Sequence, residues 1–168
     1  MAAAPSLPAV TPKGTWSDAR FGRWLALLVA AALVLRVAYV LVVERGDPLS
    51  GDGVYYHEAA NLLADGLGFT EPYRYLHGGA QELLFLDDPS SALPTANTVL
   101  PIGHVEPTAG HPPLWVVVLG LFSALGLTGV TAHQLVGAFV GAAGVAAIGW
   151  AGRSLNGPRT GLLAAGLA

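Results

Sequence analysis

Long apolar runs separated by polar stretches dominate the chain, and the first run predicts a transmembrane helix. Residues 24–43 read WLALLVAAALVLRVAYVLVV, twenty residues with one charge, Arg36. At about 1.5 Å per residue, a helix of this length matches the roughly 30 Å hydrocarbon layer of a bilayer. We therefore expect a first transmembrane helix over 21–43. A cleavable signal peptide is the competing interpretation, but its apolar core would be about 7 to 15 residues long and end in a small-residue cleavage site, which VVERGDPL lacks.

Two further apolar runs follow. Residues 112–127, PPLWVVVLGLFSALGL, are fewer than the roughly 20 that an ordinary crossing takes. The first proline disfavours helix at His111 and the second suits an early helical position, so we expect a juxtamembrane or re-entrant helix over 111–127. Residues 130–152 are long enough for a second transmembrane helix, and small residues at four-residue spacing would let it pack closely on another helix. These small residues are Gly137, Ala138, Gly141, Ala142 and Ala146.

Composition and charge predict the two ends of the chain. Residues 1–20 begin with an Ala-, Pro-, Ser- and Thr-rich segment, which is typical of a disordered tail, here cytoplasmic. Residues 153–160 contain Arg153 and Arg159 and are expected to form a cytoplasmic loop. Residues 161–168, GLLAAGLA, predict the start of a further transmembrane helix. Eight residues cannot cross a bilayer, so we expect the chain to be the N-terminal part of a larger protein.

The stretch 44–110 predicts a long extracytoplasmic loop whose first third is ordered. It contains GDGVYYHEAANLLADGLG, in which Asp52 is expected as N-cap and a helix over about 53–65 is ended by Gly66 and Gly68. The apolar positions that follow Asp52 at helical spacing predict a stripe along the membrane surface. That stripe is Tyr56, Ala59 and Leu63. From residue 71 to 109, repeated prolines and glycines predict no regular element.

Overall composition supports a membrane protein. The chain is 53% hydrophobic and 11% charged, against about 25% charged residues in ordinary soluble proteins. Since it has no cysteine, disulfides and thiolate chemistry are excluded. The fold class predicted is therefore an all-α membrane protein with transmembrane helices and a long extracytoplasmic first loop that carries juxtamembrane helices.

Charge distribution predicts which end faces which side of the membrane. Residues 44–111 contain ten of the eleven acids and only two of the eight Lys and Arg residues, an asymmetry that concerns sidedness and not nucleic acid. Basic residues flanking a transmembrane helix stay in the cytoplasm, so we expect a cytoplasmic N-terminus in a multi-pass membrane protein. If 112–127 spans, the arginines after residue 152 lie outside; if it lies on the surface, they lie inside, and we favour the second arrangement. The basic residues before the first helix are Lys13, Arg20 and Arg23.

Several blocks in order resemble the N-terminal region of bacterial polytopic glycosyltransferases of the GT-C class. They are the first helix with Arg36, GDGVYYHEAANLLADGLGF at 51–69, AGHPPLWVVVLGLFSALG at 109–126 and GRSLNGPRTGLLAAGLA at 152–168. The similarity is to the branch of dolichyl-phosphate-mannose mannosyltransferases, aminoarabinose transferases and Rgt-like sugar transferases. Together the blocks cover well over a third of the chain in family order.

The resemblance implies a glycosyltransferase of the cell envelope. Such an enzyme would move a sugar from a polyprenyl-phosphate carrier to an extracytoplasmic glycan, lipid or protein acceptor, with inversion. Asp52 matches the family's acidic residue after the first helix and would be the general base that takes the proton of the acceptor hydroxyl. Substrate-binding roles fall by position on Tyr55, Tyr56, His57 and His111, and on Arg36 for the carrier phosphate.

Structural interpretations of these residues stay open beside the functional ones. Asp52 is also expected to cap a helix, the two tyrosines would suit interfacial anchors, and Arg36 can extend its side chain toward the membrane surface. Relatives carry a second acid where Gly53 follows here, so use of a divalent metal stays open and no metal-ligating residue is assigned. No cofactor is expected beyond the lipid-linked sugar donor. There are two alternative functions. The chain could be a transporter subunit, or a small structural membrane protein that packs through its Gly and Ala stripe.

Overall fold

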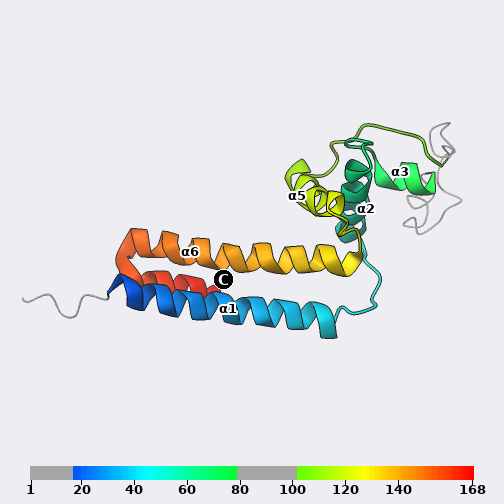
Figure 1. The fold of residues 1–168 in the computed structure, drawn as a ribbon. Helices are drawn as coiled ribbons and strands as arrows, with labels where there is room; N and C mark the ends of the chain where they lie inside the picture. Colours follow the sequence, from blue (N-terminus) through cyan, green and yellow to red (C-terminus); the bar gives the residue numbers. More distant parts are fainter. Residues whose placement is uncertain (1–16, 79–101) are drawn as a thin grey trace, which may run out of the picture. The chain divides into compact units, whose positions relative to one another are not determined.

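The computed structural model describes residues 17–78 and 102–168, and most of these residues are helical (Figure 1). Extended pairing among them is limited to a single bridge between Thr70 and Pro107. The described residues form two compact units, one of residues 17–36 with 139–168, called the first unit, and one of residues 37–78 with 102–138, called the second unit. The all-α expectation is confirmed for this part of the chain. The helices are α1 (Asp18–Val42), α2 (Asp52–Ala64), α3 (Pro72–His77), α5 (Pro113–Ala124) and α6 (Val130–Leu167).

Helix α1 begins slightly earlier than the sequence predicts. Its first residue is Asp18, so residues 18–20 belong to the helix and not to the tail. Ser17 caps it, because the Ser17 hydroxyl accepts a hydrogen bond from the Arg20 backbone N–H at 3.3 Å. The rest of the predicted tail, residues 1–16, lies outside the described residues.

Among the described residues two helices, α1 and α6, are by length and composition apolar enough to cross a membrane. Only 11% of the most apolar window of α1 is buried within the chain, and 33% of that of α6. A core helix of a soluble protein would be covered by its own chain on most sides. Much of the apolar surface of α1 is thus open among the described residues, and a lipid environment for it stays a prediction.

Helix α6 is a hairpin of two helical arms. Non-helical backbone at Asn156 and Gly157, the latter with φ of 84°, reverses the chain, and Pro158 is inside the returning arm. The predicted loop over 153–160 is thus reduced to this turn, because the first arm continues through Leu155 and proline suits the first positions of the second arm.

The arms of α6 approach closely through glycines. A Cβ atom on Gly161 would lie 2.5 Å from the Gly149 carbonyl oxygen, and one on Gly152 would lie 3.1 Å from the Gly161 Cα. Close helix contact through small residues is a feature of packing in membranes. The sequence predicts such packing for the stripe at residues 137–146, but the tightest contacts lie at these later glycines.

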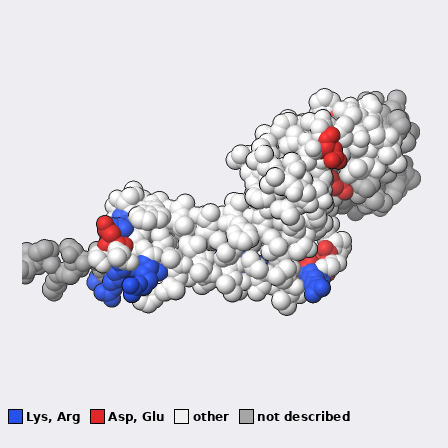
Figure 2. Space-filling view, viewed as in Figure 1, with Lys and Arg blue, Asp and Glu red and all other residues white. Residues whose placement is uncertain are grey.

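The first unit has its core where the start of α1 packs against both arms of α6. Phe21 and Leu25 pack there with Val145 and Ala165. At the same end Arg153 forms an ion pair with Asp18 and lies over the Phe21 ring at 4.5 Å. These contacts bring the beginning of α1 and the turn of α6 to one end of the first unit, where Figure 2 shows a concentration of Lys and Arg.

The second unit is built on the packing of α2 against α5. Tyr55 and Ala59 of α2 are buried against Val116, and Ala60 is buried against Leu119. The predicted stripe along α2 therefore faces α5, and the expectation that it lies along the membrane is wrong. Only Gly fits at position 120 without displacement, since a Cβ there would lie 3.0 Å from Leu63 Cδ2 and 3.3 Å from the Ala60 carbonyl oxygen.

Helix α5 has the short length expected of a juxtamembrane helix. Its 12 residues span about 18 Å, well below the roughly 30 Å of the hydrocarbon layer. The face turned away from α2 is apolar and open, with Leu114 75% exposed and Leu121 64% exposed.

Helix α3 is absent from the sequence prediction, which treats Pro72 only as a helix breaker. Pro72 instead occupies the first turn, and Gly78 ends the helix in the left-handed conformation with φ of 62°. Residues 102–108 pack beside it: Glu71 N–H donates to the Glu106 carbonyl at 2.8 Å, and Arg74 pairs with the Glu106 carboxylate at 2.6 Å.

Candidate functional site

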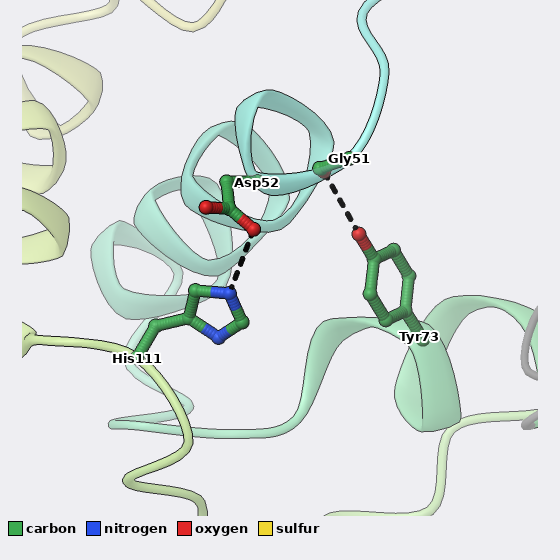
Figure 3. A network of polar contacts seen from close by, with 4 residues as sticks. All are labelled: Gly51, Asp52, Tyr73 and His111. Carbon is green, nitrogen blue, oxygen red and sulfur yellow. Dashed lines mark hydrogen bonds and ion pairs between the residues drawn. The ribbon is translucent and has the colours of Figure 1, made fainter.

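Asp52 and His111 form an accessible acid–imidazole pair. Asp52 is the first residue of α2, and the His111 Nε2 nitrogen lies 3.2 Å from its Oδ1 oxygen (Figure 3). The Asp52 side chain is 81% exposed and the His111 side chain 30% exposed. The prolines that follow His111 start α5, so the packing of α5 on α2 brings this imidazole to the carboxylate.

The predicted capping role of Asp52 is wrong. Gly51 is the N-cap residue, with φ of 54° and ψ of −132°, and no side chain caps α2. The Asp52 carboxylate bonds His111 instead of the helix N–H groups, although the N-terminal position still favours its negative charge.

Tyrosine rings enclose one side of the pair. His111 stacks on Tyr55 with ring centroids 3.8 Å apart and meets the Tyr56 ring edge-on at 5.5 Å. Tyr73 of α3 lies 6.0 Å from Tyr55, and its hydroxyl donates to the Gly51 carbonyl at 3.1 Å, as Figure 3 shows. These contacts fix His111 in orientation. They also tie α3 to the start of α2, a link that the sequence prediction missed together with α3.

The Tyr55 and Tyr73 hydroxyls remain protonated at neutral pH. Burial raises the pKa of Tyr55, and burial with nearby carboxylates raises that of Tyr73. The Nδ1 atom of His111 is buried and has no hydrogen-bond partner among the described residues. The pair therefore offers one open carboxylate, with aromatic surface beside it.

His57 does not join this pair. Its Nδ1 atom lies 3.0 Å from the Nδ1 of His133, which is buried in the first turns of α6. The His133 Nε2 is 2.9 Å from the Ser123 hydroxyl of α5, and that hydroxyl donates to the Asn61 side-chain oxygen at 2.8 Å. Burial lowers the pKa of His57, so its imidazole is uncharged at neutral pH.

Sequence reasoning missed His133, Ser123 and Asn61. A histidine in an apolar run is the one signal that was available, and no spacing rule connects residues 57 and 133. These polar groups meet only because α2, α5 and the beginning of α6 pack together.

A pocket of about 170 Å³ adjoins the histidines within the second unit. Its walls are mostly apolar, and aromatic rings of α2 and α5 contribute to them. Among its lining residues are Tyr56, His57, Trp115 and His133.

Arg36 belongs to the first unit. Its guanidinium donates to the Ala32 and Ala168 carbonyls, each at 3.4 Å, and it lies against Gly141, where an added Cβ would be 2.9 Å from the Arg36 Nε. Glycine at position 141 thus leaves room for an arginine side chain between two apolar helices. Binding of a carrier phosphate by Arg36 stays a prediction.

Metal ligation has no defined geometry in residues 17–78 and 102–168, where no three His, Asp or Glu side chains come together in a way that would hold an ion. Comparison with known proteins adds no assignment: no protein-family model matches the sequence, and neither the curated proteins nor the solved structures contain a match. A functional assignment therefore depends on the residues themselves.

Proposed function

We propose that the chain is part of a membrane glycosyltransferase that takes its sugar from a polyprenyl-phosphate carrier. The observation that supports this most is the exposed Asp52 carboxylate, paired with His111 at 3.2 Å and bordered by tyrosines. Carboxylates serve as general bases for hydroxyl nucleophiles, and aromatic rings offer apolar contact surface to the apolar face of a sugar. The resemblance to GT-C enzymes in the ordered sequence blocks leads to the same class.

In the proposed reaction, Asp52 takes the proton of an acceptor hydroxyl as that oxygen attacks the anomeric carbon of the donor sugar. A new carbon–oxygen bond forms on one face of the ring. The bond from the anomeric carbon to the phosphate oxygen breaks on the other face, and the polyprenyl phosphate leaves with the electron pair. His111 positions the carboxylate: it donates one hydrogen bond to Oδ1 and leaves Oδ2 for the hydroxyl.

Sidedness is proposed from the arrangement within the first unit. Arg153 meets Asp18, so Arg20 and Arg23 of early α1 share one end of the first unit with Arg153 near the α6 turn. Basic clusters beside transmembrane helices stay in the cytoplasm, which assigns that end to the inside of the bacterial inner membrane. A short α5 that does not cross is consistent with this, because α1 and the first arm of α6 then make two crossings. The segment from residue 44 to 129 would face outward.

The test is sugar transfer in membranes that contain the full-length protein, with a polyprenyl-phosphate sugar donor and Asp52→Asn. Removal of a general base typically costs about 10²- to 10⁴-fold in rate, so the variant should lose nearly all transfer at equal expression. Asp65→Asn is the matched control, since Asp65 is an exposed acid at the opposite end of α2 and should leave transfer unchanged. Transfer that survives Asp52→Asn would reject Asp52 as the base.

A further inference from the structure

A continuous chain of hydrogen bonds lies between α2, α5 and the beginning of α6, apart from the Asp52–His111 pair. The Asn61 amide donates to the Thr128 carbonyl at 3.2 Å and accepts from the Ser123 hydroxyl at 2.8 Å. The same hydroxyl lies 2.9 Å from His133 Nε2, and His133 Nδ1 lies 3.0 Å from His57 Nδ1. Ser123 is 4% exposed and His133 5% exposed, so both must make their hydrogen bonds within the protein, and His133 also has the Leu127 backbone near it.

The bond from the Asn61 amide to the Thr128 carbonyl determines which group donates in each of the other bonds. A carbonyl only accepts, so the Asn61 nitrogen faces Thr128 and its oxygen faces Ser123. The Ser123 hydroxyl has one hydrogen and gives it to Asn61, so it must accept from His133 Nε2–H. The neutral form of His133 then has its lone pair on Nδ1, so in that form His57 donates its Nδ1–H to it. His57 is left with a lone pair on Nε2.

That free nitrogen limits what the adjoining pocket can bind. No group among residues 17–78 and 102–168 bonds the His57 Nε2, and His57 lines the pocket of about 170 Å³ beside Tyr56 and Trp115. A neutral imidazole that presents a lone pair accepts a hydrogen bond from a hydroxyl and offers no positive charge to a phosphate. The volume is below the roughly 300–1,000 Å³ of pockets for drug-sized ligands, so it suits a single ring.

We infer that this pocket binds one hydroxyl-bearing sugar ring, with a ring hydroxyl donating to His57 Nε2 and the ring face against Tyr56 and Trp115. His133, Ser123 and Asn61 are positioning residues that hold His57 in the Nδ1–H tautomer. The inference rests on the proposed function only for the choice of a sugar as the ring. It assigns His57 to a sugar and not to the carrier phosphate.

The experiment is nitrogen NMR on the full chain in detergent micelles with ¹⁵N-labelled histidine. Proton-coupled spectra distinguish the two neutral tautomers of each ring. His57 should be protonated on Nδ1 and His133 on Nε2. Methyl glycosides of glucose, galactose, mannose and arabinose are then added singly, with inorganic phosphate as the comparison. At least one glycoside should shift the His57 Nε2 resonance while phosphate leaves it in place.

Two variants test the positioning residues. Ser123→Ala removes the acceptor that fixes His133, so the fraction of His57 protonated on Nδ1 should fall. Ser154→Ala is the matched control, because the Ser154 hydroxyl is exposed and donates locally to Ala151. His57→Phe keeps a ring but loses the acceptor and should weaken glycoside binding about 2- to 10-fold.

Each contrary result overturns the inference. His57 protonated on Nε2 in the unaltered chain would contradict the direction of the bonds, and a Ser123→Ala spectrum identical to that of the unaltered chain would contradict the coupling. A shift caused by phosphate, or by none of the glycosides, would reject the sugar pocket. None of these readouts requires sugar transfer, so they fail or succeed independently of the Asp52→Asn experiment.

Discussion

Replacing Gly120 tests whether the close contact of α5 on α2 holds the candidate site together. A Cβ at position 120 would lie 3.0 Å from a Leu63 methyl and 3.3 Å from the Ala60 carbonyl oxygen. The methyl can move, but the carbonyl belongs to the backbone of α2. Gly120→Ala therefore pushes α5 away from α2, and such overpacking costs about 1–3 kcal/mol. His111 lies two residues before α5 and would be displaced from Asp52.

The packing cost of Gly120→Ala can be separated from the effect of alanine on helix propensity by comparison with Gly144→Ala. Gly144 lies inside α6 with open space around its Cβ position, so this control only gains the roughly 0.5–1 kcal/mol of a glycine-to-alanine change in a helix. The same gain applies to Gly120→Ala. The difference between the two variants is thus the packing cost of about 1–3 kcal/mol.

Thermal unfolding in detergent micelles, followed by circular dichroism, measures this difference. For a chain of this size about 1 kcal/mol corresponds to roughly 2–4 °C, so Gly120→Ala should melt about 2–12 °C below Gly144→Ala. Equal melting temperatures would refute the reasoning, because they would mean that the helices do not meet at Gly120.

Two further predictions concern charge. Burial lowers the pKa of His57 despite the opposing effect of Glu58, so below about pH 6.5, the ordinary pKa of histidine, the unfolded chain binds more protons than the folded one. The melting temperature should therefore be level above about pH 6.5 and fall as the pH drops below it. A melting temperature that rises on acidification would contradict this. Arg153→Met removes the ion pair with Asp18 and the cation–π contact with Phe21, and should lower the free energy of unfolding by about 1–2 kcal/mol. Arg159→Met, at an exposed position, should change it by less than about 0.5 kcal/mol when both variants are compared by thermal unfolding.

Most helix positions could be predicted from the sequence because apolar runs, glycines and prolines act on the backbone where they stand. The apolar run with few charges predicted α1, and the glycines at positions 66 and 68, with φ of 85° and 66°, end α2 as expected. Proline at the second position after His111 began α5. Errors arose where one residue type has two uses: Pro72 starts a helix as readily as it breaks one.

The site was only partly predictable because it depends on contacts between helices. Asp52, Tyr55 and Tyr56 lie close in sequence, and His111 belongs to another of the blocks that carry the resemblance, so the sequence singles out all four. Their contacts with one another come from the packing of α5 on α2. The partnership of His57 with His133 joins residues 76 positions apart. Nothing local encodes it, and the apolar stripe of α2 was assigned to lipid because its true partner, α5, comes more than fifty residues later.

Cysteine labelling tests most directly whether Asp52 is solvent-accessible on the outer side of the membrane. The chain has no cysteine, so Ser50→Cys, at an exposed position beside Asp52, creates a unique thiol, and Ser154→Cys does the same near the α6 turn. A membrane-impermeant maleimide should label Ser50→Cys in intact cells and Ser154→Cys only after the membrane is permeabilised. Labelling of Ser50→Cys only in permeabilised cells would contradict an extracytoplasmic carboxylate and, with it, the proposed transfer reaction.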